Sequence, residues 1–302
     1  MIGISTVWQS GKIKSGEKLY GRIYGLGVSA VELEYRITGE TYKQMKPLLK
    51  KGELKVLSIH NFFPVPDILT AGSGDAFLLS SPDDEERKRA LKYTAITIEH
   101  ANDLEAQAVV LHLGNTGIES YKKELFKFYN EGKIKSEEYA KFLEKIKTER
   151  DKVKQKYFDS ALFCLDKLTK VAERENVMLG IENRYYLHQI PDFEEMGIIL
   201  KKFEGANIRY WHDAGHAEAW QNLGIKKHEE WLKEYGAHLL GIHLHDCEGY
   251  NDHDSPGKGK IDFKMIKNYL KPETVKIIEV EPHVTEENLR EGIIFLKDLG
   301  IK

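Results

Sequence analysis

The chain has 302 residues, of which 41% are hydrophobic and 31% are charged, a balance typical of a folded globular protein and not of a disordered one. Its 45 basic and 48 acidic residues leave a net charge of −3, so bulk charge does not attract a polyanion such as a nucleic acid. The first residues, MIGISTVWQS, lack the regions of a signal peptide, and no apolar run reaches the length of a membrane span. Two cysteines, Cys164 and Cys247, form no disulfide framework. We therefore expect a cytoplasmic protein without membrane partners.

Eight short apolar segments rich in β-branched residues recur along the chain and predict eight buried strands. They cover residues 2–8, 28–35, 54–62, 108–114, 177–183, 207–215, 239–246 and 275–281. Amphipathic stretches separate them, as in residues 87–103, where Leu91, Ala95 and Ile98 share a helical face.

Strands that alternate with helices pair in parallel, and eight such units close most simply into a (β/α)8 TIM barrel of the α/β class. An open doubly wound sheet is the alternative. That fold usually has a glycine-rich first turn, and residues 6–19 contain no GxGxxG motif. We therefore predict one barrel domain over residues 1–302.

Two segments that follow predicted strands are longer than ordinary loops. Residues 61–86 are rich in Pro, Gly and Ser, whereas residues 116–156 carry two charged helical patterns and predict a helical hairpin inserted after strand four. In a barrel both would rise over the active-site face as lids or partner surfaces; decoration without function is the alternative.

Polar residues gather at the ends of the predicted strands, where the active sites of such barrels lie. They are His60, His112, Glu182, Asp213, His216, His243, His245, Asp246, Asp252, His253 and Glu279. A single strand-end histidine is more often a hydrogen-bonded core residue than a ligand, but six strands that converge on one rim favour a site. His100 and His228 lie in helical patterns instead, and we expect them on the surface.

Imidazole and carboxylate together suit Zn²⁺, Mn²⁺ or another first-row divalent ion. His243 and His245 point to the same side of their strand, so that one can bind the ion while the other supports it or contacts substrate. Arg184 lies on the same side as Glu182, although salt-bridged packing explains it nearly as well. Trp8 is expected in the core by default, with an apolar wall against a substrate ring as the other interpretation.

The ordered motifs of the chain resemble the xylose isomerase-like barrel superfamily along nearly the whole sequence. They are GISTVW, VELEYR, HNF, HLG, GIENR, HDAGHA, GIHLHDCEGYNDHDSPGKGKIDF and IIEVEPH. This superfamily contains sugar and sugar phosphate isomerases and epimerases as well as the endonuclease IV group. Its ketose epimerases hold one divalent ion with four residues from strands five to eight, which match Glu182, Asp213, His243 and Glu279.

The resemblance implies catalytic roles for three residues. Glu182 and Glu279 would flank the substrate carbon, one removing a proton and the other returning it. The ion would polarise the adjacent carbonyl and stabilise an enediolate. His216 would contact a substrate hydroxyl or carbonyl.

The endonuclease IV group is the alternative, with a trinuclear zinc site whose added ligands match His60, His112, His216 and a D-x-H pair. His253 supplies the histidine of that pair, but Asn251 stands at the aspartate position and Asp252 is displaced by one. The net charge of −3 also argues against a protein that grips a phosphate backbone.

We therefore favour a metal-dependent isomerase or epimerase of a small sugar or sugar phosphate over a zinc-dependent phosphodiesterase or nuclease. His245 and Asp246 are expected to contact the substrate. Zn²⁺ and Mn²⁺ are the expected ions, with Co²⁺ and Mg²⁺ as alternatives. A barrel that binds a sugar without catalysis is a third interpretation. The identity of the sugar, the number of metals and a homo-oligomeric state are left open.

Overall fold

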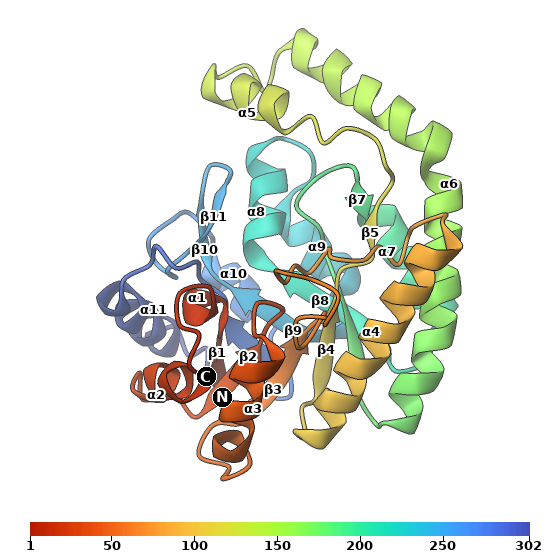
Figure 1. Ribbon diagram of the computed structural model, residues 1–302. Helices are drawn as coiled ribbons and strands as arrows, with labels where there is room; N and C mark the ends of the chain where they lie inside the picture. Colours follow the sequence, from red (N-terminus) through yellow and green to blue (C-terminus); the bar gives the residue numbers. More distant parts are fainter.

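The computed structural model describes residues 1–302 and contains a closed barrel of eight parallel strands surrounded by helices (Figure 1). The strands follow one another around the barrel in chain order: β1 (Ile2–Ser5), β2 (Ala30–Leu33), β3 (Lys55–His60), β4 (Ala108–Leu111), β6 (Met178–Glu182), β8 (Ile208–Asp213), β9 (Leu239–Leu244) and β12 (Val275–Ile278). The predicted (β/α)8 fold is confirmed. Each predicted segment contains its strand but extends into the following loop.

The strands are apolar because both of their faces are covered. Seven residues, Ala30, Leu57, Ala108, Val110, Trp211, Val275 and Ile277, form a separate apolar cluster. A larger cluster of 73 buried residues runs through the layer between strands and helices. Strands buried on both sides lose the alternation of polar and apolar residues, which is why they appear in the sequence as continuous hydrophobic runs.

Trp211 is the largest of these side chains, and two glycines on the neighbouring strands make room for it. A Cβ atom at Gly180 would lie 2.8 Å from the Trp211 ring, and one at Gly241 would lie 2.2 Å from it. Trp211 pairs in register with Gly241, and its ring contacts His243 edge-on at a centroid distance of 5.2 Å. The tryptophan therefore supports the His243 imidazole from within the barrel.

Eleven α-helices accompany the strands. They are α1 (Val7–Ser10), α2 (Gly16–Tyr24), α3 (Gly39–Leu49), α4 (Asp84–Asp103), α5 (Lys122–Asn130), α6 (Glu137–Arg174), α7 (Phe193–Lys202), α8 (Ala214–Asn222), α9 (His228–Tyr235), α10 (Phe263–Lys267) and α11 (Glu286–Asp298). The predicted helix over 87–103 begins three residues earlier, because the side chain of Asp83 accepts a hydrogen bond from the backbone of Glu86 and caps the first turn. No helix is both long enough and apolar enough to cross a membrane.

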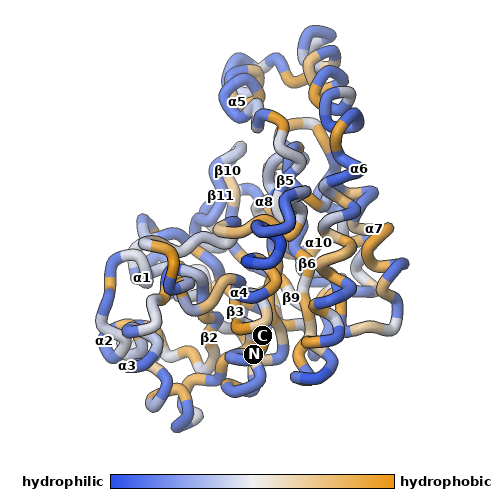
Figure 2. The backbone as a smooth tube through the Cα atoms, turned by 45° about the vertical axis from the view of Figure 1, so that its right-hand side comes forward, coloured by the Kyte–Doolittle hydropathy of each residue, from blue (hydrophilic) through white to orange (hydrophobic).

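The segment after β4 is helical but is not a separate hairpin that ends at residue 156. α5 forms its first arm, whereas the second arm continues as α6 for 38 residues and becomes the barrel helix before β6. Residues 137–174 contain no glycine or proline that would end the helix. α5 and the first half of α6 project beyond the barrel (Figures 1 and 2).

Other loops at the same end carry two small antiparallel pairs. β5 (Gly114–Asn115) pairs with β7 (Gln189–Ile190), and β10 (Asp246–Glu248) pairs with β11 (Asn251–Asp254). The long segment predicted after strand three contains no helix or strand between His60 and Asp84. These loops and α5 surround the carboxyl ends of the barrel strands.

Candidate metal centre

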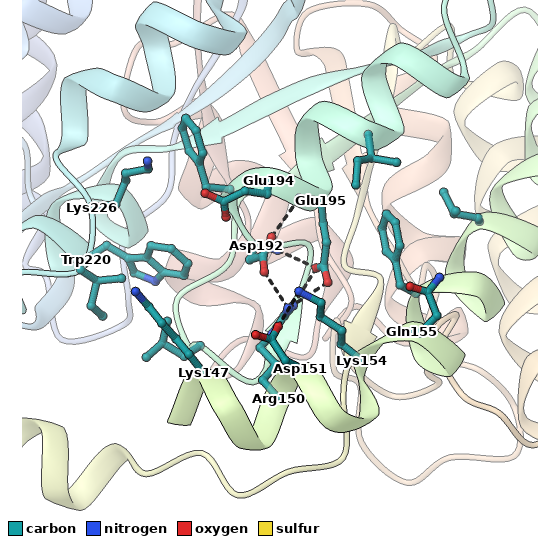
Figure 3. A pocket seen from close by; sticks show the side chains of 16 residues that line it. Lys147, Arg150, Asp151, Lys154, Gln155, Asp192, Glu194, Glu195, Trp220 and Lys226 are labelled. Atoms are coloured by element: carbon teal, nitrogen blue, oxygen red, sulfur yellow. Dashed lines mark hydrogen bonds and ion pairs between the residues drawn. The ribbon is translucent and has the colours of Figure 1, made fainter. Parts of the chain in front are cut away.

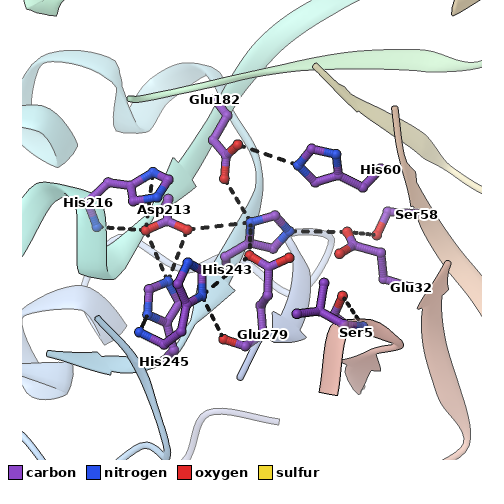
Figure 4. A network of polar contacts seen from close by, with 12 residues as sticks. Ser5, Glu32, Ser58, His60, Glu182, Asp213, His216, His243, His245 and Glu279 are labelled. Atoms are coloured by element: carbon purple, nitrogen blue, oxygen red, sulfur yellow. Dashed lines mark hydrogen bonds and ion pairs between the residues drawn. The ribbon is translucent and has the colours of Figure 1, made fainter. Parts of the chain in front are cut away.

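Four side chains from the ends of β6, β8, β9 and β12 form the centre of the site (Figure 4). They are Glu182, Asp213, His243 and Glu279, and their potential ligand atoms all lie within 4.8 Å of one another. Parallel pairing accounts for this arrangement, since the β8–β9 register places Asp213 directly beside His243. All four residues are buried.

His243 Nδ1 is the atom around which the three carboxylates converge. It lies 2.9 Å from Glu182 Oε1, 3.2 Å from Glu279 Oε2 and 3.6 Å from Asp213 Oδ2. Its other nitrogen, Nε2, lies 3.2 Å from Glu32 Oε2. Glu32 therefore orients the ring and leaves Nδ1 facing the carboxylates, as a carboxylate does for a metal-bound histidine.

The electrostatics of this group are dominated by its carboxylates. Burial lowers the pKa of His243, but the charges of Glu279 and Glu32 outweigh that effect and raise the pKa well above its ordinary value. Burial opposes ionisation of Glu182, yet the neighbouring His112 holds the pKa of Glu182 well below its ordinary value. For Glu279 burial dominates and raises the pKa to about 8. The two glutamates therefore have opposite protonation preferences.

A second group extends the site towards β3 and β4. His112 Nε2 lies 2.6 Å from Glu182 Oε2, and His60 Nε2 lies 3.7 Å from the same oxygen. The two imidazoles contact each other edge-on at 4.6 Å between centroids. This second group, His60, His112 and Glu182, therefore overlaps the central group at the Glu182 carboxylate.

A third group consists of His216, Asp252 and His253. Nε2 of each histidine lies 3.8 Å from Asp252 Oδ2. The carboxylate displaced by one position in the sequence therefore occupies the place beside His253, whereas Asn251 is exposed. Asp252 and His253 both lie in β11. His253 adopts a φ of 59°, an uncommon backbone conformation for a residue other than glycine.

Two histidines of the outer groups, His60 and His216, have the protonation pattern that a divalent cation requires. Nδ1 of His60 donates to the Asn61 carbonyl at 2.9 Å, and Nδ1 of His216 donates to the Asn183 carbonyl at 2.9 Å. A carbonyl oxygen only accepts, so each Nδ1 carries the hydrogen and each Nε2 keeps its lone pair for a ligand. Together with buried carboxylates and without a thiolate, this donor set suits Zn²⁺ or Mn²⁺.

Arg184 is the cation of the site. Its guanidinium lies 3.3 Å from Glu182 Oε2 and 3.1 Å from Asp75 Oδ2, and the whole residue is buried. Sequence reasoning missed Asp75, which comes from the long loop before α4. No sequence signal marks it, because an aspartate in a Gly/Ser-rich loop is typical of a turn. Glu32, in β2, is a further residue of the site through its contact with His243.

Three residues considered above as substrate contacts are buried. Trp8 is fully buried, and its indole nitrogen donates to the Val284 carbonyl at 2.8 Å, so it is a core residue. Asp246 accepts backbone hydrogen bonds from Cys247, Gly257 and Ile261 and so holds the loop after β11. His245 is also buried, with Nε2 3.0 Å from Asp213 and Nδ1 accepting from the His253 backbone at 2.8 Å. His245 also forms a further group of potential ligands with His253 and Glu279. Polar strand-end residues can serve the backbone as well as a ligand, so the substrate contacts of His245 and Asp246 stay predictions.

The expected surface position of His228 is also wrong. His228 is buried and joins a chain of hydrogen bonds behind Asp213: His228 Nδ1 lies 2.9 Å from Glu218, and its Nε2 lies 2.9 Å from His212 Nε2. His212 Nδ1 lies 2.6 Å from the Tyr210 hydroxyl. His100 is half-buried and packs edge-on against Tyr42 at 5.0 Å.

A cavity of about 700 Å³ opens above the ligand groups and is lined by His112, Arg184, His216, Asp252 and His253. A second cavity of about 590 Å³ lies between α6 and α7, away from these residues (Figure 3).

The second cavity is built around a structural ion pair. The Arg150 guanidinium lies 2.6 Å from Asp192 Oδ2 and 2.6 Å from Glu195 Oε2, and these two acidic residues form the capping box of α7. Arg150 thereby fastens the long helix α6 to the barrel. Among the strand-end polar residues, His112, Arg184 and His216 line the first cavity and not the second.

Comparison with known proteins agrees with this architecture. Residues 22–299 match the sequence family described as xylose isomerase-like TIM barrel. No curated protein sequence matches the chain. Many solved structures are similar to the chain, among them three that cover nearly all of it. A D-tagatose 3-epimerase-like protein is 20% identical, with a TM-score of 0.66 and coverage of 99% of this chain and 96% of the other.

The 3-keto-D-glucoside 4-epimerase YcjR from E. coli, in its apo form, is 14% identical, with a TM-score of 0.67 and coverage of 98% of each chain. The IOLI protein with a binding zinc atom is 16% identical, with a TM-score of 0.65 and coverage of 99% of this chain and 97% of the other. At sequence identities of 14–20%, similarity to these structures shows the fold alone. The match to the family model over residues 22–299 shows the family. The chain belongs to the xylose isomerase-like TIM barrel family.

Proposed function

We propose that this protein is a divalent-metal-dependent isomerase or epimerase of a sugar or sugar phosphate. One observation carries the proposal: the buried carboxylates of Glu182 and Glu279 approach the same His243 nitrogen, at 2.9 and 3.2 Å, beneath a polar cavity. Two carboxylates at a shared point are suited to remove a proton from a carbon atom and return one to it.

The four central residues, Glu182, Asp213, His243 and Glu279, would hold the ion, with Zn²⁺ or Mn²⁺ expected and Co²⁺ or Mg²⁺ as alternatives. A bound ion supplies Lewis acidity that polarises the substrate carbonyl. Glu32 keeps the His243 ring in place through its contact with Nε2. The buried walls exclude water from the carboxylates, which keeps the proton transfers between protein and substrate.

In the proposed reaction Glu182 takes the proton from the carbon next to the carbonyl. The electron pair of that C–H bond moves to the carbonyl oxygen and gives an enediolate. Glu279 then donates its proton to the same carbon from the opposite face as the electron pair returns, which inverts the centre. In an isomerase the proton would go instead to the former carbonyl carbon, while the hydroxyl on the first carbon loses its proton and becomes the new carbonyl. His216 and Arg184, which line the cavity, would contact the hydroxyls or the carbonyl of the sugar.

The named activities of similar structures support this proposal. Two of the three compared structures are named as sugar epimerases or epimerase-like, and the third is described with zinc. We further propose that residues 1–302 act as one domain on a small-molecule substrate. Cys164 and Cys247 are both free, which agrees with a reducing, cytoplasmic location.

A second candidate function is a zinc-dependent phosphodiesterase, which the two outer ligand groups favour. His60 with His112, and His216 with Asp252 and His253, provide positions for two further ions beside the central one. Several metals that share one bridging carboxylate are typical of enzymes that displace a group at phosphorus.

Metal content distinguishes the two candidates. The protein is stripped with a chelator, reloaded with Zn²⁺, Mn²⁺, Co²⁺ or Mg²⁺, desalted and measured by elemental analysis. We expect one tightly held ion per chain, and solvent deuterium incorporation into a ketose from a mixed panel only after reloading. Three zinc ions per chain together with cleavage of an abasic-site duplex would instead establish the phosphodiesterase and overturn the ranking.

A further inference from the structure

The cavity above the ligand groups continues outward into an aromatic wall. His112, His216 and His253 line its inner part, whereas Phe126, Tyr186 and Tyr250 line its outer part. Cavities of about 300–1,000 Å³ hold ligands of drug size. At about 700 Å³ this cavity has more room than one hexose ring needs.

Contacts between separate loops hold the outer wall in place. The rings of Phe126 in α5 and Tyr250 stack at 3.7 Å between centroids with 6° between their planes. Asn130 Nδ2 donates to the Tyr250 hydroxyl at 3.0 Å. Gly249, at φ +65°, lets Tyr129 approach, since a Cβ there would lie 3.0 Å from the tyrosine oxygen. The helical segment after β4 therefore contributes a preformed part of the cavity.

The charge of the cavity disfavours a phosphate group. Two permanently cationic side chains line it, against five carboxylates: Lys122 and Arg184 against Asp75, Glu248, Asp252, Asp254 and Glu281. Arg184 is already bound by Glu182 and Asp75. Lys122 has no carboxylate within 4 Å, but its ammonium lies over the Phe126 and Tyr186 rings, 5.6 Å from each centroid.

We propose that this outer wall, formed by Phe126, Tyr186, Tyr250 and Lys122, is a subsite for a second, uncharged sugar ring. Phe126 and Tyr250 cover one face of each other by stacking, so the apolar C–H face of the sugar would pack against the aromatic surface that this stacking leaves uncovered, and the Lys122 ammonium donates hydrogen bonds to its hydroxyls. The substrate is then a glycoside of the ketose and not a free or phosphorylated ketose. This inference rests on the proposed function, which places the reacting ring at Glu182 and Glu279.

The test compares three probes with the metal-loaded protein: ketohexoses, their 6-phosphates and their 6-O-glucosyl derivatives. Deuterium incorporation from D₂O gives kcat/KM for each. We expect the glucosyl derivative to exceed the free ketose at least tenfold. Phe126→Ala lowers this ratio about tenfold, the effect of losing one aromatic contact. Phe128→Ala, on the same helix but packed against Tyr139 at 5.2 Å, keeps the ratio and serves as the matched control.

Binding separates a failure of the subsite from a failure of the proposed function. Calorimetry compares two unreactive probes, a hexitol and its 6-O-glucosyl derivative. Tighter binding of the glucosyl form, lost in Phe126→Ala, supports the subsite even if no ketose exchanges deuterium, in which case only the proposed function fails. Equal binding of both probes, an unchanged ratio in Phe126→Ala, or preference for the phosphates overturns the subsite.

Discussion

Glu182 connects the ligand groups of the site. Its Oε1 lies beside His243, while its Oε2 lies beside His112, His60 and Arg184. A carboxylate with this many cationic or hydrogen-donating neighbours stays ionised although it is buried. An ionised carboxylate is what a proton acceptor needs.

His212, in the hydrogen-bond chain behind Asp213, makes stability depend on pH. Burial and then the neighbouring His228 lower the pKa of His212 well below its ordinary value. As the pH falls below about 6.5, the unfolded chain binds a proton at this histidine that the folded chain does not, so the free energy of unfolding decreases.

We therefore predict that His212→Gln is less stable than the wild type at pH 7.5 but loses less stability on acidification. Between pH 6.5 and 5.5 one proton accounts for up to about 1.4 kcal/mol per pH unit. Urea denaturation of both proteins across this range measures the two slopes. Parallel slopes would show that His212 takes up a proton in the folded state.

Most residues of the candidate site could be predicted from their positions at strand ends, because a (β/α)8 barrel brings the carboxyl ends of all its strands to one rim. His60, His112, Glu182, Asp213, His216, His243, His253 and Glu279 all lie in the ligand groups. Sequence reasoning did not foresee hydrogen-bond partners that lie in loops. Asp246 binds three backbone amides that follow it in the chain, and hydrogen bonds of this kind have no sequence pattern.

Among the contacts between strands, that of Trp211 with Gly241 affects both the stability of the barrel and the position of His243. A methyl group at Gly241 would lie 2.2 Å from the rigid indole, whose edge supports His243. We predict that Gly241→Ala destabilises the fold by about 1–3 kcal/mol, the usual cost of an overpacked core.

The control is Gly21→Ala in α2, where a Cβ meets no atom within 4 Å. Alanine favours a helix over glycine by roughly 1 kcal/mol, so this variant is expected to be as stable as the wild type or more so. Thermal unfolding of the three proteins decides the matter. A Gly241→Ala protein that melts with the wild type would mean that the barrel interior yields to the extra methyl group.

All eight strands could be predicted because each is a buried run of apolar residues between amphipathic helices. The extent of α6 could not. Its residues follow a helical pattern both in the part predicted as an inserted arm and in the part that covers the barrel. Whether one helix or two result depends on tertiary contacts, such as the ion pairs of Arg150 with α7, that only the fold reveals.

In the whole molecule, the barrel strands and the loops have different roles. The parallel strands bring the acidic and imidazole side chains together, and the loops and α5 enclose the cavity above them. Loops can vary while the strand ends keep their geometry, which is how one barrel family serves different substrates. The wall of Phe126 and Tyr250 is a feature of such loops.

We propose that one divalent ion and Glu182 together move a proton at the carbon next to a sugar carbonyl. Deuterium incorporation from D₂O tests it most directly, measured by NMR on metal-loaded wild type and Glu182→Gln, with bound metal quantified in both samples. We predict incorporation by the wild type only when metal is bound, and a loss of about 10²-fold or more in Glu182→Gln with its metal retained. Incorporation at the wild-type rate in the metal-loaded variant would contradict the account.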